Sequence, residues 1–180
     1  VRIKNFGENT FPEMLSTLAH LHFNGMKSLI IDLRGNRGGY MHPSIQMANE
    51  FLDEDQLIVY TEGSKVKRED YRSNGLGSFK HLPLVVLVDE MSASSSEIFA
   101  GAIQDNDRGT IIGRRSFGKG LVQQPMQFND GSEVRLTIAR YHTPSGRCIQ
   151  KPYTKGDSES YAMDLIERYN NGEFFSKDSI

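Results

Sequence analysis

Several features that would assign this chain to a class of protein are scarce or missing. Its one cysteine, Cys148, excludes an internal disulfide and any metal site built from several cysteines. Its longest apolar run, LPLVVLV at residues 82–88, is far shorter than the ~20 residues that a membrane-spanning helix needs. Lysine and arginine total 21 and the acidic residues 23, for a net charge of −2, so no strong field favours nucleic acid or an anionic membrane.

The composition that remains is that of one globular domain. The chain has 180 residues, of which 37% are hydrophobic and 24% charged, and it has only 6 prolines. It begins at Val1 rather than at a methionine, shows no signal peptide and enters a strand-like segment at once. We therefore interpret it as a piece of a longer protein.

Apolar runs alternate with amphipathic runs over the first two thirds of the chain. Strands are expected at residues 1–6, 28–33, 56–61, 82–90 and 109–112. Helices are expected at about residues 10–24 and 43–52 and after Glu90, and Thr10 and Glu13 form a capping-box pattern at the first. Strands that alternate with helices predict an α/β fold with buried parallel strands.

Turn signals and polar segments complete this outline. Asn-Asp-Gly at residues 129–131 predicts a hairpin between strands at 121–128 and 132–141. Residues 62–80 are polar and contain glycine, which indicates a hairpin arm or a flap. After about residue 154 the chain is polar, and one more helix is expected at residues 158–170.

The segment GRRSFGKG, residues 113–120, nearly matches a phosphate-binding loop. Such a loop needs Ser or Thr directly after its lysine to coordinate Mg²⁺, and it opens a helix whose amides receive phosphate. Here Gly120 follows Lys119, and the next residues, LVQQPMQF, are typical of a strand. We therefore do not interpret this segment as a nucleotide site, and Lys119 needs another role.

Ser94 lies between the most hydrophobic strand and an amphipathic helix. With Glu97 three residues later it has capping-box spacing, so its simplest interpretation is a helix N-cap. The same position suits a nucleophile, because unpaired amides at a helix N-terminus can stabilise an oxyanion. A serine hydroxyl is a poor nucleophile until a base takes its proton. Both interpretations stay open on these residues alone.

Lys119 is a candidate for that base. The five histidines occupy positions typical of surface or boundary residues, and no motif assigns one to Ser94. Lys119 has Phe117 and Leu121 nearby, and apolar shielding would lower the pKa of a lysine and let it accept a proton. Gln123, four residues later, would lie beside Lys119 in a helix or about 13 Å along the same face of a strand.

Four segments in order then resemble one family of enzymes. They are LIIDLRGNRGG, VDEMSASSSEIFAGAIQD, RSFGKGLVQQ and ARYHTPSGRCIQ. Together they resemble the C-terminal processing, or tail-specific, serine peptidases over about residues 1–152. The resemblance implies an α/β core of the Clp-protease/crotonase-like type. We expect residues 1–155 to form this catalytic core and residues 156–180 to be a polar C-terminal segment.

The resemblance also implies a role for each site residue. Ser94 would be the nucleophile, Lys119 the general base in a Ser/Lys dyad, and Gln123 the residue that orients the lysine. The oxyanion would be held by the backbone N–H of Ser95 and by a glycine of the loop at residues 34–39. That glycine would be Gly39 or its neighbour Gly38. No metal or organic cofactor is implied.

The activity implied is that of a serine endopeptidase that cuts protein or peptide substrates near their C-termini. The parent protein would be bacterial-type and would act outside the cytoplasm, in the periplasm or cell envelope. The competing interpretation is a non-catalytic relative that binds peptides or apolar ligands, which predicts loss of the serine or the lysine. Both Ser94 and Lys119 are present.

Some residues depart from the family pattern or are given only internal roles. Ser95 stands where the family often has alanine, and Arg37 where proline is frequent. The PDZ domain that usually precedes the core is absent from this chain. Asp32 and Arg34 are expected to make hydrogen bonds within the loop, and Cys148 to be an inert thiol.

Overall fold

The computed structural model describes residues 1–152 and 158–175, which form two sheets and four helices. A parallel sheet has the strand order β1-β4-β5, with β1 at Leu29–Asp32, β4 at Leu84–Val88 and β5 at Thr110–Gly113. An antiparallel sheet has the order β3-β2-β7-β6, formed by Glu69–Arg72, Leu57–Glu62, Glu133–His142 and Leu121–Gln127. The helices are α1 (Thr10–Phe23), α2 (Met41–Asn49), α3 (Ser95–Asp105) and α4 (Ser158–Asn170).

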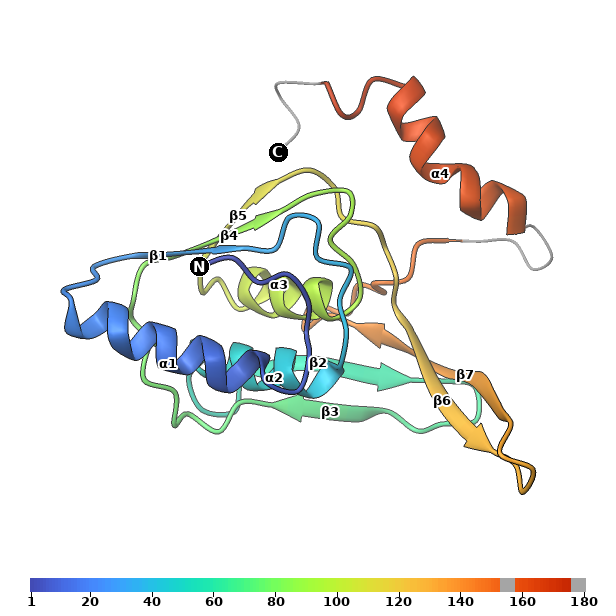
Figure 1. The fold of residues 1–180 in the computed structure, drawn as a ribbon, viewed down its shortest axis with the longest axis horizontal. Helices are drawn as coiled ribbons and strands as arrows, with labels where there is room; N and C mark the ends of the chain where they lie inside the picture. Colours follow the sequence, from blue (N-terminus) through green and yellow to red (C-terminus); the bar gives the residue numbers. More distant parts are fainter. Residues whose placement is uncertain (153–157, 176–180) are drawn as a thin grey trace.

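Helices α2 and α3 lie between the two sheets, whereas α1 and α4 lie at opposite ends of the molecule (Figure 1). The core forms where α3 meets both sheets, and its fully buried side chains include Ile31, Val86, Phe99 and Ile103. The predicted α/β fold with parallel strands is confirmed. The parallel sheet is buried on the face that packs against α3. On its other face, Ile30 and Ile112 are 54% and 51% exposed.

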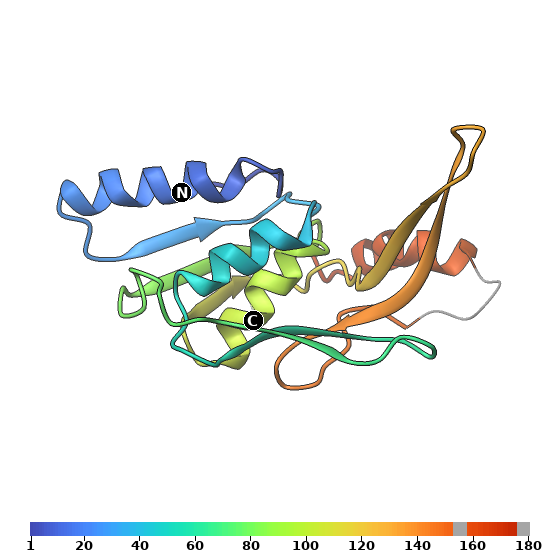
Figure 2. The same ribbon diagram turned by 90° about the horizontal axis from the view of Figure 1, so that it is seen from below.

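The antiparallel sheet carries the two predicted hairpins. Strand β3 pairs with β2, so the segment expected to be an arm or flap forms a hairpin strand. Strands β6 and β7 pair from Leu121 opposite Arg140 to Gln127 opposite Glu133, and their hairpin projects from the rest of the molecule (Figure 2). Gly131 closes the turn at a φ of +84°, a conformation that glycine adopts without steric cost.

Three local expectations are corrected. Residues 1–6 form no continuous strand and make only isolated bridges, from Arg2 to Asp32 and from Phe6 to Gly39. Thr10 is the first residue of α1 and not its cap, because its hydroxyl is bonded to Gly7 N–H and to the carbonyl of Asn5. Helix α2 begins two residues earlier than expected.

The C-terminal helix expected at residues 158–170 is α4. Within the described ranges, no helix is long and apolar enough to cross a membrane. The division into a core at 1–155 and a separate C-terminal segment remains a prediction.

Candidate active site

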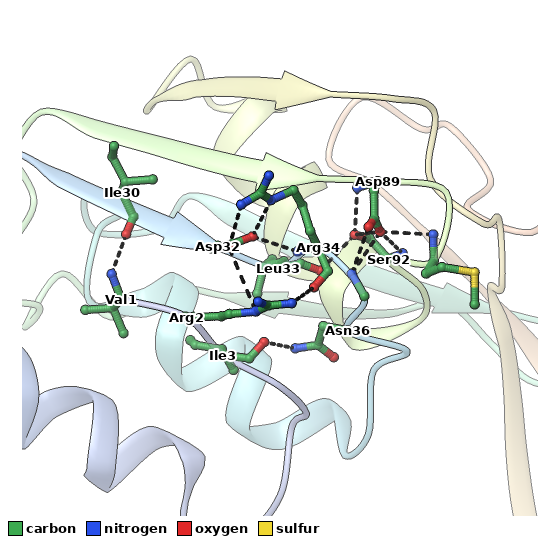
Figure 3. Close-up of polar contacts among 12 residues, drawn as sticks. Val1, Arg2, Ile3, Ile30, Asp32, Leu33, Arg34, Asn36, Asp89 and Ser92 are labelled. Atoms are coloured by element: carbon green, nitrogen blue, oxygen red, sulfur yellow. Dashed lines mark hydrogen bonds and ion pairs between the residues drawn. The ribbon is translucent and has the colours of Figure 1, made fainter. Parts of the chain in front are cut away.

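The site is built on the turns that follow two neighbouring parallel strands. Asp89, directly after β4, accepts hydrogen bonds from the amides of Gly35, Met91 and Ser92 at 2.9, 3.0 and 3.1 Å. Ser92 in turn donates its hydroxyl to the carbonyl of Leu33 at 2.9 Å (Figure 3). The turn after β4 is therefore tied to the glycine loop after β1, as expected for a site at the carboxyl edge of a parallel sheet.

Ser94 holds a strained backbone conformation at the start of α3. Its φ of 56° and ψ of −114° lie in a region that residues other than glycine rarely occupy. Such strain costs about 1–3 kcal/mol and persists only where surrounding contacts impose it. A serine on a sharp strand-to-helix turn is also the arrangement that exposes the nucleophile in many hydrolases. The N–H of Ser95, the first helical residue, donates to no partner among the described residues.

An ion pair stiffens the start of the glycine loop. Arg34 donates from Nε and from a terminal nitrogen to both oxygens of Asp32, at 2.9 and 3.0 Å (Figure 3). The same carboxylate accepts the Arg34 backbone N–H at 3.0 Å. The hydrogen bonds from Arg34 lower the pKa of Asp32 to about 2, against the opposing effect of burial. The internal role expected for these two side chains is confirmed.

Asn36 joins the glycine loop to the nucleophile turn. Its side chain is fully buried, donating to the carbonyl of Ile3 at 2.9 Å and accepting the N–H of Gly38 at 2.8 Å. Its carbonyl accepts the Ala93 amide at 3.0 Å and the Ser96 hydroxyl at 2.9 Å. One buried amide side chain and its own carbonyl thus connect the N-terminal segment, the loop and α3.

Both glycines of the loop are in close backbone contact. A Cβ on Gly38 would fall 2.7 Å from the Cβ of Ser94, and one on Gly39 would fall 2.2 Å from the carbonyl oxygen of Phe6. The hydroxyl of Ser95 donates to the Gly39 carbonyl at 3.0 Å, which fastens the loop to α3. The N–H of Gly38 is engaged by Asn36, whereas that of Gly39 has no partner among the described residues.

Glu97 connects Ser94 to the segment that carries Lys119. Its carboxylate, in a residue only 7% exposed, accepts the Ser94 amide at 2.8 Å and the Lys119 amide at 2.9 Å on one oxygen. The other oxygen accepts the Ser116 hydroxyl at 2.6 Å and the Gly118 amide at 2.7 Å. Burial raises the pKa of Glu97, and these four hydrogen bonds oppose that rise by favouring the carboxylate.

The lysine loop, residues 115–120, is fixed by further backbone contacts. Phe117 donates its amide to the carbonyl of Ser92 at 2.9 Å. Gly120 donates to the side-chain oxygen of the buried Gln150 at 3.0 Å and accepts the Tyr141 amide at 2.7 Å. The amides on both sides of Lys119 are thus held, and so is the amide of Lys119 itself.

The surroundings of the Lys119 and Gln123 side chains differ from those predicted from the neighbouring residues in the sequence. The Lys119 side chain is exposed and makes no ion pair or hydrogen bond with the described residues. The apolar shielding expected around it is wrong for this structure, because Phe117 packs against Tyr161, and Leu121 and Val122 pair with β7. Gln123 lies in β6 opposite Thr137, and it too is exposed.

The chain is similar to proteins of one peptidase family. The family model described as peptidase family S41 matches residues 1–160. The chain belongs to peptidase family S41. It is 40% identical over 151 residues to a carboxyl-terminal-processing protease of Synechocystis, covering 84% of this chain and 35% of that protein. It is 35% identical to the carboxy-terminal processing protease CtpA of Bacillus subtilis, covering 96% of this chain and 39% of the relative.

A solved structure supports the same membership. The photosystem II D1 C-terminal processing protease matches with a TM-score of 0.77 at 38% identity, over 83% of this chain and 38% of that one. The Clp-protease-like α/β fold expected from the resemblance is therefore confirmed. The chain spans a little over a third of the length of the relatives it matches.

Several residues of this S41 site have roles that the sequence did not predict. Glu97 was interpreted only as a helix cap, and Asn36, Ser92 and Gln150 were given no role. Asn36 and Gln150 could have been suspected, since both lie in segments that carry the family resemblance. Their function depends on partners far away in the chain, which the sequence does not reveal: Asn36 bonds Ile3, 33 positions away.

The histidines and the cysteine were also considered in the sequence as candidate groups. His142 stacks on Tyr60 with ring centroids 4.7 Å apart, and His22 contacts the Phe79 ring edge-on. Cys148 is a free, exposed thiol. Among the described residues, no group of three or more His, Cys, Asp or Glu side chains could hold a metal ion.

Proposed function

We propose that this S41 domain is a serine endopeptidase that cleaves protein or peptide chains near their C-termini. In this proposal Ser94 is the nucleophile and Lys119 the general base of a Ser/Lys dyad, and Gln123 orients the lysine. Backbone amides of Ser95 and of the glycine loop hold the oxyanion. The names of the relatives, which are carboxyl-terminal processing proteases, support the substrate class.

The observation that carries the proposal is the shared carboxylate of Glu97. It accepts the amide of Ser94 and the amide of Lys119 on the same oxygen, at 2.8 and 2.9 Å. Residues 25 positions apart are thereby brought to the two sides of one atom. A nucleophile and its base must come within hydrogen-bond reach, and a shared backbone anchor favours that approach.

The chemistry follows from these groups. Neutral Lys119 takes the proton of the Ser94 hydroxyl while the oxygen attacks the scissile carbonyl, and the carbonyl oxygen becomes an oxyanion. The lysine then passes that proton to the leaving amine, and an acyl-enzyme on Ser94 remains. A water molecule, deprotonated by the same lysine, hydrolyses this ester and frees the serine.

The oxyanion donors proposed are the Ser95 N–H and one glycine N–H. Ser95 is favoured because its amide opens α3 and has no partner among the described residues. Of the two glycines, Gly39 has an N–H that is unbonded within the described part of the chain, whereas that of Gly38 is held by Asn36. We therefore propose Gly39, with Gly38 as the packing residue against Ser94. One donor of this kind is typically worth about 3 kcal/mol in the transition state.

Because the Lys119 side chain is exposed, this proposal gives the bound substrate a role in completing the site. Burial in apolar surroundings favours the neutral form of an amine. We propose that a bound peptide covers the lysine and supplies the apolar surroundings that the loop itself lacks. The lysine would then act as a base only when substrate is present.

The location proposed is outside the cytoplasm, in the periplasm or cell envelope of a bacterium. Relatives named as C-terminal processing enzymes include bacterial and chloroplastic proteins, which is the support for it. The partners proposed are the C-terminal tails of protein substrates.

The test is cleavage of unfolded casein and of a peptide with an apolar C-terminus, from about pH 6 to about pH 10. The wild-type chain is compared with Ser94→Ala and Lys119→Ala. Ser64→Ala and Lys67→Ala serve as matched controls, because both side chains are exposed and belong to the segment between β2 and β3. Activity in the wild type and both controls, lost in both site variants, would support the proposal.

Two results would count against it. Activity that survives Lys119→Ala at neutral pH would remove the lysine from the role of base. If the wild-type chain and its variants bind the peptide but none of them cleaves it at any pH tested, the result would favour the non-catalytic alternative.

A further inference from the structure

Helix α4 contacts the lysine loop through residues distant from it in the sequence. It lies at the far end of the molecule from α1 (Figure 1), and most of it lies beyond residue 160, where the match to the family model ends. The helix nevertheless reaches the loop through a buried side chain. The α4 residues that make this contact therefore lie outside the part of the chain that the family model matches.

Arg168 is that side chain. It is only 4% exposed, although arginine is seldom buried without partners. One terminal nitrogen donates to the carbonyl of Arg115 at 2.6 Å, and the other to the carbonyl of Ser116 at 3.2 Å. Glu173, in the turn after α4, accepts from Nε at 3.0 Å and from a terminal nitrogen at 2.7 Å. The buried charge is thus directed at two loop carbonyls and paired with a carboxylate that also accepts from the Arg115 side chain at 3.0 Å.

Ser116 links this contact to the catalytic side. Its carbonyl accepts from Arg168, and its hydroxyl donates to Glu97 at 2.6 Å. Glu97 also holds the amides of Ser94 and Lys119. A continuous chain of hydrogen bonds therefore runs from α4 through the loop to the nucleophile.

Lys151 adds a second contact between α4 and the loop. Its amide donates to the Gly118 carbonyl at 2.9 Å, and its Nζ pairs with Asp164 on α4 at 2.9 Å. The same ammonium lies 4.7 Å from the ring centroid of Phe117 and 4.2 Å from that of Tyr161. These distances are typical of cation–π contacts.

Part of the lysine loop lines a cleft. A cleft of about 580 Å³ opens there, and its lining includes Glu97, Phe117, Gly118, Lys151, Asp164 and Arg168. A segment that lines open space depends more on its polar contacts than a segment in the core does, and Arg168 supplies two of those contacts. The position of the loop should therefore depend on α4.

We propose that α4 holds the lysine loop in its catalytic position and that Arg168 is the positioning residue. The inference rests on the proposed role of Lys119 as general base. Arg168 touches neither substrate nor reacting atoms, so its loss should lower kcat and leave KM nearly unchanged. The core should stay folded, because the contact lies at its edge.

The experiment compares Arg168→Met, Arg168→Lys and the control Arg147→Gln with the wild-type chain. Arg147 lines the same cleft, but its side chain is bonded to Asp105 and Ser145 and not to the described lysine loop. Amide hydrogen exchange by mass spectrometry, resolved over residues 113–121, reports the loop without any need for activity. Peptide cleavage then gives kcat and KM.

For Arg168→Met we expect exchange in residues 113–121 to rise about ten-fold or more, with exchange in β1 and β4 unchanged. We expect kcat to fall about ten-fold or more while KM changes by less than about three-fold. Arg168→Lys should be intermediate, since an ammonium keeps the charge but cannot bridge both carbonyls and Glu173. Arg147→Gln should match the wild type in both measurements.

The failures of the two proposals are separable. If Ser94 and Lys119 prove essential but Arg168→Met exchanges and turns over like the wild type, the positioning role is wrong and the peptidase proposal stands. A rise in exchange spread over the whole chain would also overturn it, because that indicates general destabilisation. If the wild type shows no Ser94-dependent cleavage, the catalytic part of the inference fails together with the proposed function, and exchange alone decides whether α4 holds the loop.

Discussion

Replacing Glu97 by glutamine removes the charge on which four hydrogen bonds converge and keeps the shape of the side chain. One carboxylate oxygen accepts from the amides of Ser94 and Lys119, and the other from the Ser116 hydroxyl and the Gly118 amide. In glutamine one of these acceptors becomes an NH₂ group that faces two donors. The Ser116 hydroxyl can rotate and accept, so we expect the NH₂ group on that side. Gly118 then loses its acceptor.

The magnitude follows from these losses. A buried N–H left without an acceptor costs about 1–3 kcal/mol, and the bonds that remain lose their charge assistance. These losses fall on the lysine loop and on the backbone of Ser94. If the displacement of Ser94 and Lys119 raises the activation free energy by about 3 kcal/mol, kcat falls roughly a hundred-fold, since about 1.4 kcal/mol corresponds to a factor of ten.

The effect on global stability should be smaller and should depend on pH. Burial raises the pKa of Glu97 above its ordinary 4.5, so the folded protein binds this proton more tightly than the unfolded chain. The wild type therefore loses stability through this group as pH rises from about the unfolded value to the folded one. Glutamine does not ionise, so the free energy of unfolding of the Glu97→Gln variant should rise relative to that of the wild type between these two pH values.

The assay measures kcat and KM for peptide cleavage and the free energy of unfolding in urea at several pH values. Glu50→Gln is the matched control, since Glu50 is also a buried glutamate, 9% exposed, and among the described residues its carboxylate accepts only the Ser78 amide, at 3.1 Å. We expect this control to keep its kcat. A Glu97→Gln variant with kcat within about three-fold of the wild type would refute the proposed link between the serine and the lysine loop.

Two further predictions concern backbone strain and an ion pair. Ser94→Gly and Ser94→Ala should both be inactive, but the glycine variant should be more stable by about 1 kcal/mol, because glycine adopts the φ of 56° at this position without the strain that a Cβ causes. Equal urea midpoints for the two variants would show that the residue is not strained. Arg34 lowers the pKa of Asp32 from 3.8 to about 2. The pair therefore stabilises the fold at pH values above the pKa of Asp32 in the unfolded chain, and this effect is lost as the pH falls to about 2. Asp32→Asn should therefore cost about 1 kcal/mol at neutral pH, after allowance for the half-exposed arginine, and nothing at the acid end; a pH-independent cost in urea unfolding would contradict this cause.

Local patterns in the sequence were enough to place most of the secondary structure. The hydrophobic segments became β1, β2, β4 and β5, and the Asn-Asp-Gly turn became the tip of the β6–β7 hairpin. These features depend on neighbouring residues, through alternation of side chains along a strand and the backbone freedom of glycine. Ser94 at a helix N-terminus was predictable for the same reason, because capping is a relation between residues three positions apart.

The surroundings of Lys119 were not predictable in this way. Its sequence neighbours are apolar, yet Phe117 contacts Tyr161, and Leu121 pairs with β7, so the lysine is left exposed. The direction in which a side chain points depends on where its strand or loop is packed. That packing involves residues distant in the sequence.

The α/β class, the order of the strands along the chain and the family of this domain follow from the amino-acid sequence, because these depend on periodicity and on motifs in order. How the motifs meet depends on the packing of the folded chain. This packing brought Glu97 between Ser94 and Lys119, tied Asn36 to Ile3, and set Arg168 of α4 against the lysine loop. The physical reason is that a buried polar group must find its partner in space, and the partner can lie anywhere along the chain.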